Sequence, residues 1–196
     1  AEYIVGRRSI DASPAIGVAI YGEHTKQMDR LIKFADFAMF QAKMLKNTSA
    51  RSISVFDMQE FIKSEKSTIT TKLIRDAVEK KTFKTVFQPI LNVHSGKIEA
   101  YEALSRPLDN SLPHIGAIFD IANKNWLLKP LSRALSEITR DSWLQKGNGR
   151  GLFVNEPPFF LYGEGELDPM EELAQRIGPD KVTIEITEQV QYDREI

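Results

Sequence analysis

The sequence of 196 residues contains no cysteine. This absence excludes disulfide bonds, thiolate nucleophiles and zinc sites with sulfur ligands. Histidine is scarce as well, and His24, His94 and His114 lie far apart in segments that read as turns or loops. We therefore expect no metal site built from clustered histidines. A chain without cysteine is suited to a reducing compartment, and we expect it in the cytoplasm.

The sequence also lacks an excess of charge and a long apolar run. Its formal net charge is −1, so no overall positive field favours a nucleic acid polymer as partner. No apolar run approaches the roughly 20 residues that a membrane-spanning helix needs, and the first residues do not resemble a secretory signal. We expect no membrane contact within this chain, although segments outside it could anchor a longer protein at the inner membrane.

Residues 1–57 are predicted to form a strand, a helix and a second strand. Apolar and small residues alternate over residues 15–21, as in a strand with one packed face. Apolar residues then recur at helical spacing over residues 28–45, and residues 53–56 form another apolar run. Such a unit buries one helix face and little more. We therefore expect it to be part of a larger domain.

The sequence of this segment resembles the last third of a GGDEF (diguanylate cyclase) domain. The resemblance rests on residues 15–19 and 35–43, while the motif that names the family is not in this segment. The glycine that usually follows the Ala-Lys pair of the family is missing from residues 44–47. In the family the lysine that matches Lys43 touches nucleotide phosphate; the alternative is a solvated lysine on a helix face. We expect no cyclase activity from this segment.

Residues 58–82 are predicted to form a helical connector. Ile69, Leu73, Ile74 and Val78 give it a narrow apolar stripe among many charged residues. Such a helix could pack on its own chain or pair with its copy in a homodimer.

The remaining residues, 83–196, alternate predicted strands with predicted helices. The strands are expected over residues 85–91, 98–106, 152–155 and 182–188, and the helices over residues 115–123 and from Pro130 and Pro169. This alternation is typical of a mostly parallel sheet or an α/β barrel. Pro89 cannot donate a hydrogen bond to a sheet, which predicts an edge or a bulge in the first strand.

Glu102, Asn155 and Glu185 all fall near the C-terminal ends of predicted strands. In α/β barrels the functional groups lie at that end. Two carboxylates and a carboxamide oxygen are hard ligands, which suit Mg²⁺ or Mn²⁺ better than zinc. Glu102 also shares a strand face with Arg106, and a buried charge there needs a partner, a metal or a ligand. An internal salt bridge between these two residues is the alternative interpretation.

Four motifs of this segment resemble the front half of an EAL-type cyclic di-GMP phosphodiesterase domain. They occur in the order and approximate spacing of that family, at residues 88–90, 102–106, 153–155 and 185–188. The resemblance covers roughly residues 70–196. With the GGDEF-like tail it implies a GGDEF/EAL tandem protein of bacterial cyclic di-GMP signalling. The expected fold is α/β: a partial GGDEF-like α/β sandwich (1–57), the connector (58–82) and the first half of an EAL-type (β/α) barrel (83–196).

The resemblance also implies roles for single residues. It makes Glu102, Asn155 and Glu185 metal ligands, Gln88 and Arg106 contacts to the dinucleotide, and Glu188 a catalytic-site residue that steadies a loop. The implied reaction opens cyclic di-GMP to the linear dinucleotide. Two divalent ions can activate water and clamp the phosphate in such a reaction, and arginine can hold a phosphate by two parallel hydrogen bonds.

Other features weigh against catalysis by this chain alone. The tandem aspartates, the lysine and the later glutamate of the family come from strands that follow the Glu185 strand, so we expect this chain alone not to hydrolyse cyclic di-GMP. The alternative function is a catalytically inactive EAL-type receptor or a protein-interaction module. Glu156 follows Asn155 where the family more often has an apolar residue, and this extra acid beside the ligand could perturb metal binding.

Overall fold

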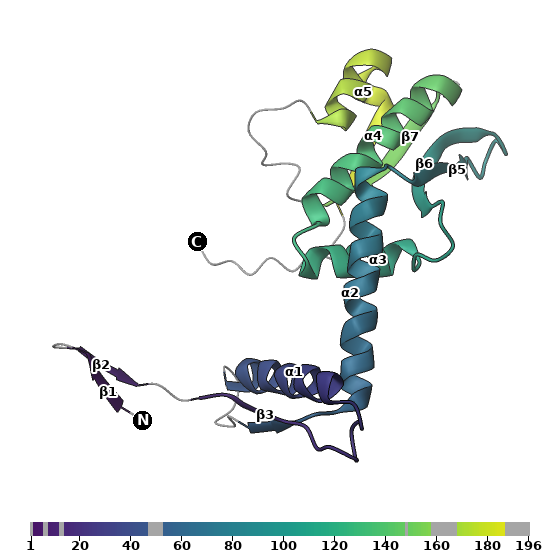
Figure 1. Ribbon diagram of the computed structural model, residues 1–196. Coiled ribbons are helices and arrows are strands. Elements are labelled where there is room, and N and C mark those ends of the chain that lie inside the picture. The colour runs from purple at the N-terminus through teal and green to yellow at the C-terminus, as the bar shows by residue number, and fades with distance from the viewer. Residues whose placement is uncertain are drawn as a thin grey trace. The chain divides into compact units, whose positions relative to one another are not determined.

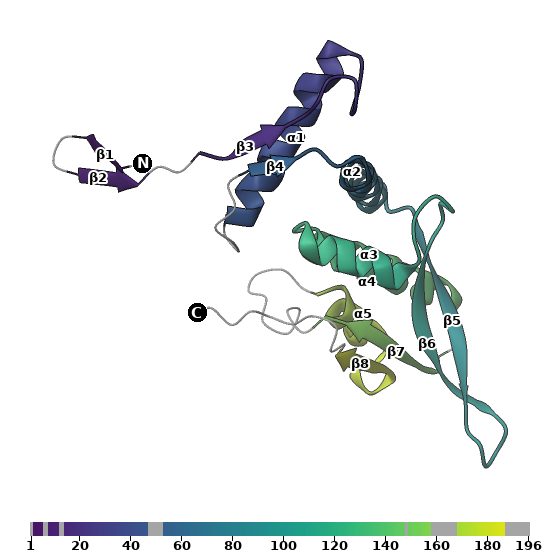
Figure 2. The same ribbon diagram turned by 90° about the horizontal axis from the view of Figure 1, so that it is seen from below.

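The computed structural model describes residues 2–5, 8–11, 14–46, 53–147, 149–157 and 168–186. The chain divides into two compact units, residues 1–68 and 69–196, which Figures 1 and 2 draw from two directions. Helix α2 (Met58–Glu79), at the place of the predicted connector, contributes its first part to one unit and its last part to the other. Among the described residues, none of the helices is long and apolar enough to cross a membrane.

The first unit contains the predicted strand, helix and strand. Strand β3 (Ile16–Val18) pairs in parallel with β4 (Ile53–Val55), and α1 (Met28–Lys46) packs against both. A separate antiparallel pair, β1 (Glu2–Val5) and β2 (Arg8–Asp11), precedes them.

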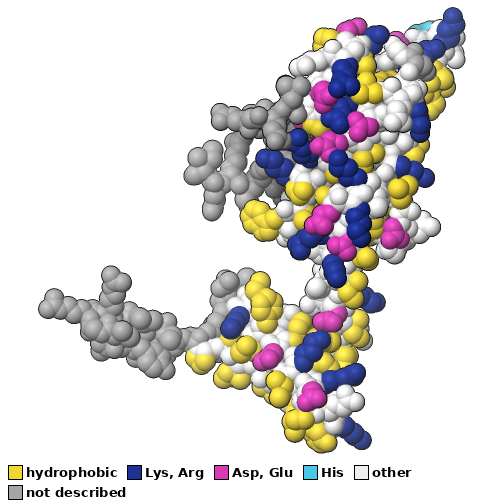
Figure 3. Space-filling view, turned by 45° about the horizontal axis from the view of Figure 1, so that its top comes forward, with side chains coloured by type: hydrophobic (Ala, Val, Ile, Leu, Met, Phe, Trp, Pro, Cys, Tyr) yellow, Lys and Arg dark blue, Asp and Glu magenta, His cyan; other side chains and the backbone are white. Residues whose placement is uncertain are grey.

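The core of this first unit is small. Phe34, Ala38 and Phe56 form its buried centre, where the rings of Phe34 and Phe56 stack with centroids 4.0 Å apart. Other apolar side chains of α1, β3 and β4 stay exposed, and Figure 3 shows hydrophobic side chains spread over the surface of this unit. The unit therefore buries little apolar surface, and we expect its free energy of unfolding to be small.

The second unit is built on one four-stranded sheet. Its strands are β5 (Phe83–Leu91), β6 (Ile98–Pro107), β7 (Gly151–Glu156) and β8 (Val182–Ile186), hydrogen-bonded in that order. The first two are antiparallel, and β6, β7 and β8 are parallel. Strand β5 lies at the edge of the sheet, and its register shifts between Ile90 and Leu91, next to Pro89. The mostly parallel sheet and the position of the proline are therefore confirmed.

Helices cover one face of this sheet. They are α3 (Ile115–Lys124), α4 (Leu128–Lys146) and α5 (Pro169–Ile177), which begins after its N-cap Asp168. Trp143 of α4 packs against Phe87 and Tyr101 of the sheet, with ring centroids 4.9 Å and 5.7 Å apart. A second core joins the end of α2 to α3 and α4.

Helix α4 begins at Leu128, two residues before the predicted start at Pro130. The amide groups of the first helical turn have no partner within the helix, so a proline is tolerated there without loss of a hydrogen bond. The prediction therefore mistook a residue inside the first turn for the first helical residue.

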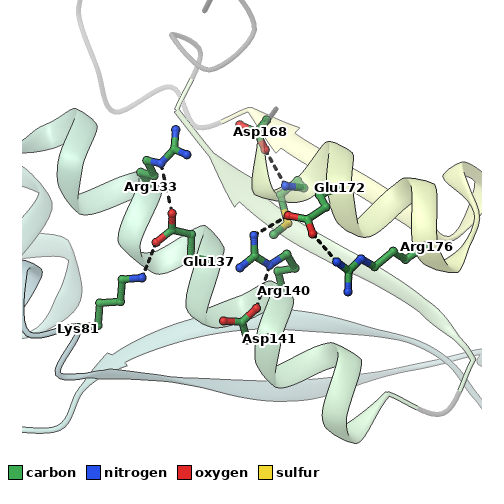
Figure 4. Close-up of polar contacts among 9 residues, drawn as sticks. Lys81, Arg133, Glu137, Arg140, Asp141, Asp168, Glu172 and Arg176 are labelled. Carbon is green, nitrogen blue, oxygen red and sulfur yellow. Dashed lines mark hydrogen bonds and ion pairs between the residues drawn. The ribbon is translucent and has the colours of Figure 1, made fainter. Parts of the chain in front are cut away.

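A chain of ion pairs ties α5 to α4 (Figure 4). Arg140 Nη1 lies 2.7 Å from Glu172 Oε2, and Arg176 Nη2 lies 2.6 Å from Glu172 Oε1. Arg140 also contacts Asp141 at 2.8 Å. Because Arg140 and Glu172 are partly shielded from water, their pair orients α5 more firmly than isolated surface pairs would.

Trp126, between α3 and α4, has a left-handed backbone with φ of 59°. Its side chain is 94% exposed, so it contributes little packing. Side chains with a Cβ are strained at such φ values, whereas glycine is not. We expect Trp126→Gly to be more stable than Trp126→Ala by about 1 kcal/mol. Urea denaturation of both variants measures this difference, and equal stabilities would contradict the assigned strain.

Candidate functional site

Five of the predicted site residues, Arg106 among them, lie on the face of the second unit's sheet that α4 and α5 leave uncovered. Gln88 is the cross-strand partner of Glu102, and Asn155 is the partner of Glu185. Glu102 is in turn the partner of Phe153, which lies two residues before Asn155 on β7. Residues two apart on a strand share a face. The alternation of the sequence and the register of the sheet therefore bring these residues together.

Glu102 and Asn155 are in direct contact. Asn155 Nδ2 donates a hydrogen bond to Glu102 Oε1 over 3.0 Å. Rotating the carboxamide by 180° about its last bond presents its oxygen at the same place, since the two ends of the group have nearly the same shape. Glu185 flanks Asn155 on the other side, on β8. The carboxylates of Glu102 and Glu185 therefore lie on opposite sides of the Asn155 carboxamide.

This donor set fits a hard divalent cation. Carboxylate and carboxamide oxygens are the ligands that Mg²⁺ and Mn²⁺ prefer. Within the part of the chain that the structure describes, no three His, Cys, Asp or Glu side chains are grouped to hold a metal ion. Glu102, Asn155 and Glu185 include only two such acids, so the assignment of these three as metal ligands stays a prediction.

Arg106 lies on the same sheet face, near the C-terminal end of β6. Its partner across the strands is Lys84. Arg106 Nη1 donates to the carbonyl oxygen of Ser105 over 2.8 Å. In the described residues no ion pair joins Arg106 to Glu102, so the structure does not contain the internal salt bridge considered as an alternative. Glu188, the remaining predicted site residue, lies outside the described residues.

A cavity of about 560 Å³ opens beside these strand ends. It lies between the ends of β6 and β7 and the helices α3 and α4, and Arg106 and Asn155 contribute to its wall. Its volume falls within the range of small-molecule binding sites. The buried hydroxyl of Ser132 in the same wall has no hydrogen-bond partner in the described residues. A ligand with a polar edge could satisfy that hydroxyl.

The expectation that Glu156 perturbs metal binding is corrected by the structure. Its side chain is 4% exposed and contacts Ser136 of α4, on the face opposite to Asn155. Burial raises the pKa of the Glu156 carboxyl to about 8, against the opposing effect of the Ser136 hydrogen bond, and the nearby Asp168 charge raises it further. The carboxyl is therefore mostly neutral at pH 7 and faces away from Glu102.

The hydrogen bonds around Ser136 agree with a neutral Glu156. Ser136 Oγ is 2.9 Å from the carbonyl oxygen of Ser132 and also contacts Glu156 Oε1. A hydroxyl carries one proton and a carbonyl carries none, so Ser136 can donate to only one of these two oxygens. A protonated Glu156 completes the pattern, because it donates to Ser136 while Ser136 donates to Ser132. The strand alternation alone could have placed Glu156 on this buried face.

The comparison with protein families matches residues 72–196, more than half of the chain, to the model of the EAL domain. The comparison with curated proteins finds no match. Solved structures with a similar fold include the FimX EAL domain of Xanthomonas citri in complex with c-diGMP, at 20% identity and a TM-score of 0.53. The match covers 65% of this chain and 52% of that one.

A second similar structure is the EAL enzyme Bd1971 in its cAMP- and cyclic-di-GMP-bound form, at 17% identity and a TM-score of 0.51. The match covers 85% of this chain and 48% of that one. The chain thus spans about half the length of these proteins. The comparisons confirm the predicted EAL-like segment and its mixed α/β fold. None of them supports the GGDEF-like interpretation of residues 1–57, which stays a prediction.

Proposed function

This chain belongs to the EAL domain family, and on that premise we propose that it forms part of a phosphodiesterase site that hydrolyses cyclic di-GMP with Mg²⁺ or Mn²⁺. The observation that carries the proposal is the placement of Glu102, Asn155 and Glu185 on one open sheet face. They are the three oxygen-bearing residues for which the EAL resemblance implies metal binding. Gln88 and Arg106 border the same face.

The residues of this chain would have separate roles in binding the cation and the dinucleotide. Glu102, Asn155 and Glu185 would hold the cation, which supplies a polarised phosphate oxygen and an activated water when bound. Arg106 would bind and orient a phosphate, since its Nη1 bond to Ser105 leaves its other guanidinium donors for that purpose. Gln88, the neighbour of Glu102, would fix the dinucleotide by a hydrogen bond.

Two observations support a cyclic dinucleotide as the substrate. The cavity beside Arg106 and Asn155 is of a size to accept part of such a ligand. The FimX and Bd1971 structures, which share this fold, hold c-diGMP in the forms compared. Cyclic di-GMP is therefore the partner with which the proposal is tested.

The hydrogen bond between Asn155 and Glu102 favours a second candidate function. This bond gives one carboxylate oxygen of Glu102 a partner other than a cation. Such an arrangement suits a receptor that binds cyclic di-GMP but does not hydrolyse it. The two candidates differ in whether nucleotide binding and turnover require the divalent ion.

The variant Glu102→Gln tests the metal-ligand assignment. It keeps the size of the side chain and removes the charge, so we expect Mn²⁺ affinity to fall on the order of 10- to 100-fold, with loss of hydrolysis in any active form of the protein. Titration calorimetry measures Mn²⁺ binding. Glu99→Gln is the matched control, because Glu99 lies on the same strand, is exposed, and accepts a hydrogen bond from Asn92 on the neighbouring turn.

Each result has a distinct meaning. Unchanged Mn²⁺ affinity in Glu102→Gln would remove Glu102 from the metal site. Cyclic di-GMP binding that needs no metal and is followed by no turnover would select the receptor over the enzyme. Absence of cyclic di-GMP binding to the wild-type protein would contradict both candidate functions.

A further inference from the structure

Two cations face each other across β5 and β6. Lys84 is the direct cross-strand partner of Arg106. The Cβ atoms of such partners lie about 5 Å apart, and like charges in this position destabilise a sheet. A neighbouring acid or an anionic ligand would offset this repulsion.

The described residues do not supply an acid that pairs with either cation. Arg106 donates to the Ser105 carbonyl, and neither Lys84 nor Arg106 forms a salt bridge within the described part of the chain. Glu102, the nearest acid on that face of β6, accepts from Asn155 instead. The two positive charges are thus left without a counter-charge from these residues.

An open cavity of about 600 Å³ lies over this pair and is lined by Lys84, Arg106, Asp109 and His114 among others. Asp109 is its one carboxylate among the described residues; its Oδ1 accepts from the Ser111 amide over 2.7 Å, and this bond lowers the pKa of Asp109. His114 Nδ1 accepts from the Ala117 amide over 3.3 Å and caps the start of α3. Two positive charges and one negative charge therefore leave the cavity net positive.

Arg106 connects this cavity to the site described above. It lines both the 600 Å³ cavity and the 560 Å³ cavity that contains Asn155. An anion held between Lys84 and Arg106 would therefore lie next to the 560 Å³ cavity. Arginine supplies a planar fork of donors and lysine a compact positive charge, a combination that suits the several oxygens of a phosphate.

We propose that Lys84 and Arg106 together form a subsite for a phosphate group of the nucleotide ligand, with Lys84 as a binding residue outside all four sequence motifs. The inference rests on the proposed function for the identity of the ligand. It adds Lys84 as a binding residue, which the resemblance does not imply. On β5 the resemblance implies only Gln88 as a contact to the dinucleotide.

The test compares Lys84→Gln with Lys97→Gln. Both substitutions remove one exposed positive charge, but Lys97 lies in the turn at the far end of the β5–β6 hairpin. We expect Lys84→Gln to bind cyclic di-GMP about 5- to 10-fold more weakly and with a smaller dependence on salt, and Lys97→Gln to bind as the wild type does. Removal of the like-charge contact should leave the folded state at least as stable, which thermal denaturation checks.

A second probe separates the subsite from the proposed function. Inorganic pyrophosphate is titrated into the same proteins while the backbone amide signals of Lys84 and Arg106 are followed by NMR. Shifts in the wild type that weaken in Lys84→Gln support the subsite even if cyclic di-GMP does not bind and the proposed function fails. Equal cyclic di-GMP affinity in Lys84→Gln and Lys97→Gln would overturn the inference and leave the proposed function intact. Absence of pyrophosphate shifts together with absence of dinucleotide binding would overturn both.

Discussion

Replacing Glu156 with glutamine is expected to raise the free energy of unfolding at pH 8 by on the order of 3 kcal/mol. The Glu156 carboxyl is 4% exposed, and burial raises its pKa to about 8. At that pH the wild-type protein must either keep a proton on this group or bury a charge. Glutamine does neither, and its carboxamide N–H can still donate a hydrogen bond to Ser136.

The sign of the effect follows from proton binding. In the unfolded chain the glutamate loses its proton near its ordinary pKa of about 4.3, whereas in the folded chain it keeps the proton up to about pH 8. Between these values the folded state binds more protons, so the stability of the wild type falls as the pH rises. The stabilisation from the protonated Glu156 carboxyl is fully present below the pKa that this group has in the unfolded chain. It is lost as the pH rises through the pKa that the group has in the folded chain. The glutamine variant lacks it.

Urea denaturation at several values between pH 5 and pH 9 measures the effect. Glu137→Gln is the control, because the hydrogen bond from Lys81 lowers the pKa of Glu137 and gives the opposite sign. Glu137 adds stability above its ordinary pKa, and that stability is lost as the pH falls through its lowered pKa. Its variant should therefore be destabilised by a similar amount at every pH from 5 to 9, with no change in the slope over that range. If Glu156→Gln keeps the wild-type slope between pH 5 and pH 8, the assignment of a neutral buried acid is wrong.

The case of Glu156 shows what the sequence could and could not tell. Alternation along β7 places Asn155 on one face, and it places Glu156 on the other. The expectation that Glu156 perturbs metal binding rested only on its position next to Asn155 in the sequence. What no local pattern could show is that Ser136, 20 residues earlier, meets Glu156, since that contact depends on how α4 packs on the sheet.

The Lys84–Arg106 pair is a second contact that the local sequence pattern could not predict. Periodicity predicts which residues of a strand share a face, and it placed Glu102 and Arg106 together on β6. Which residue stands opposite Arg106 depends on the register of the hairpin, including the shift between Ile90 and Leu91. Register is set by the turn and by packing across the whole sheet. The sequence therefore predicted the strands and the shared face of Glu102 and Arg106 but not this partner.

Replacing Gly17 with alanine should destabilise the first unit by about 3 kcal/mol or more, which is at the upper end for overpacked sites. A Cβ built on Gly17 would lie 2.1 Å from the carbonyl oxygen of Ala35 and 2.1 Å from the amide nitrogen of Met39. Both are backbone atoms of α1, so no side-chain rotation can relieve the clash. Helix α1 would have to move away from β3, which would also disturb the packing of Phe34.

Gly22→Ala is the matched control in the same unit. A Cβ at Gly22 meets no atom within 4 Å, and only the backbone φ of 87° opposes the substitution, at a cost of about 1 kcal/mol. Both tryptophans, Trp126 and Trp143, lie in the second unit, so the readout for the first unit is hydrogen exchange of the α1 amides. Much faster exchange in Gly17→Ala than in Gly22→Ala is the expected result. Equal exchange in the two variants would mean that α1 does not pack on β3 through Gly17, because only that contact distinguishes the two substitutions.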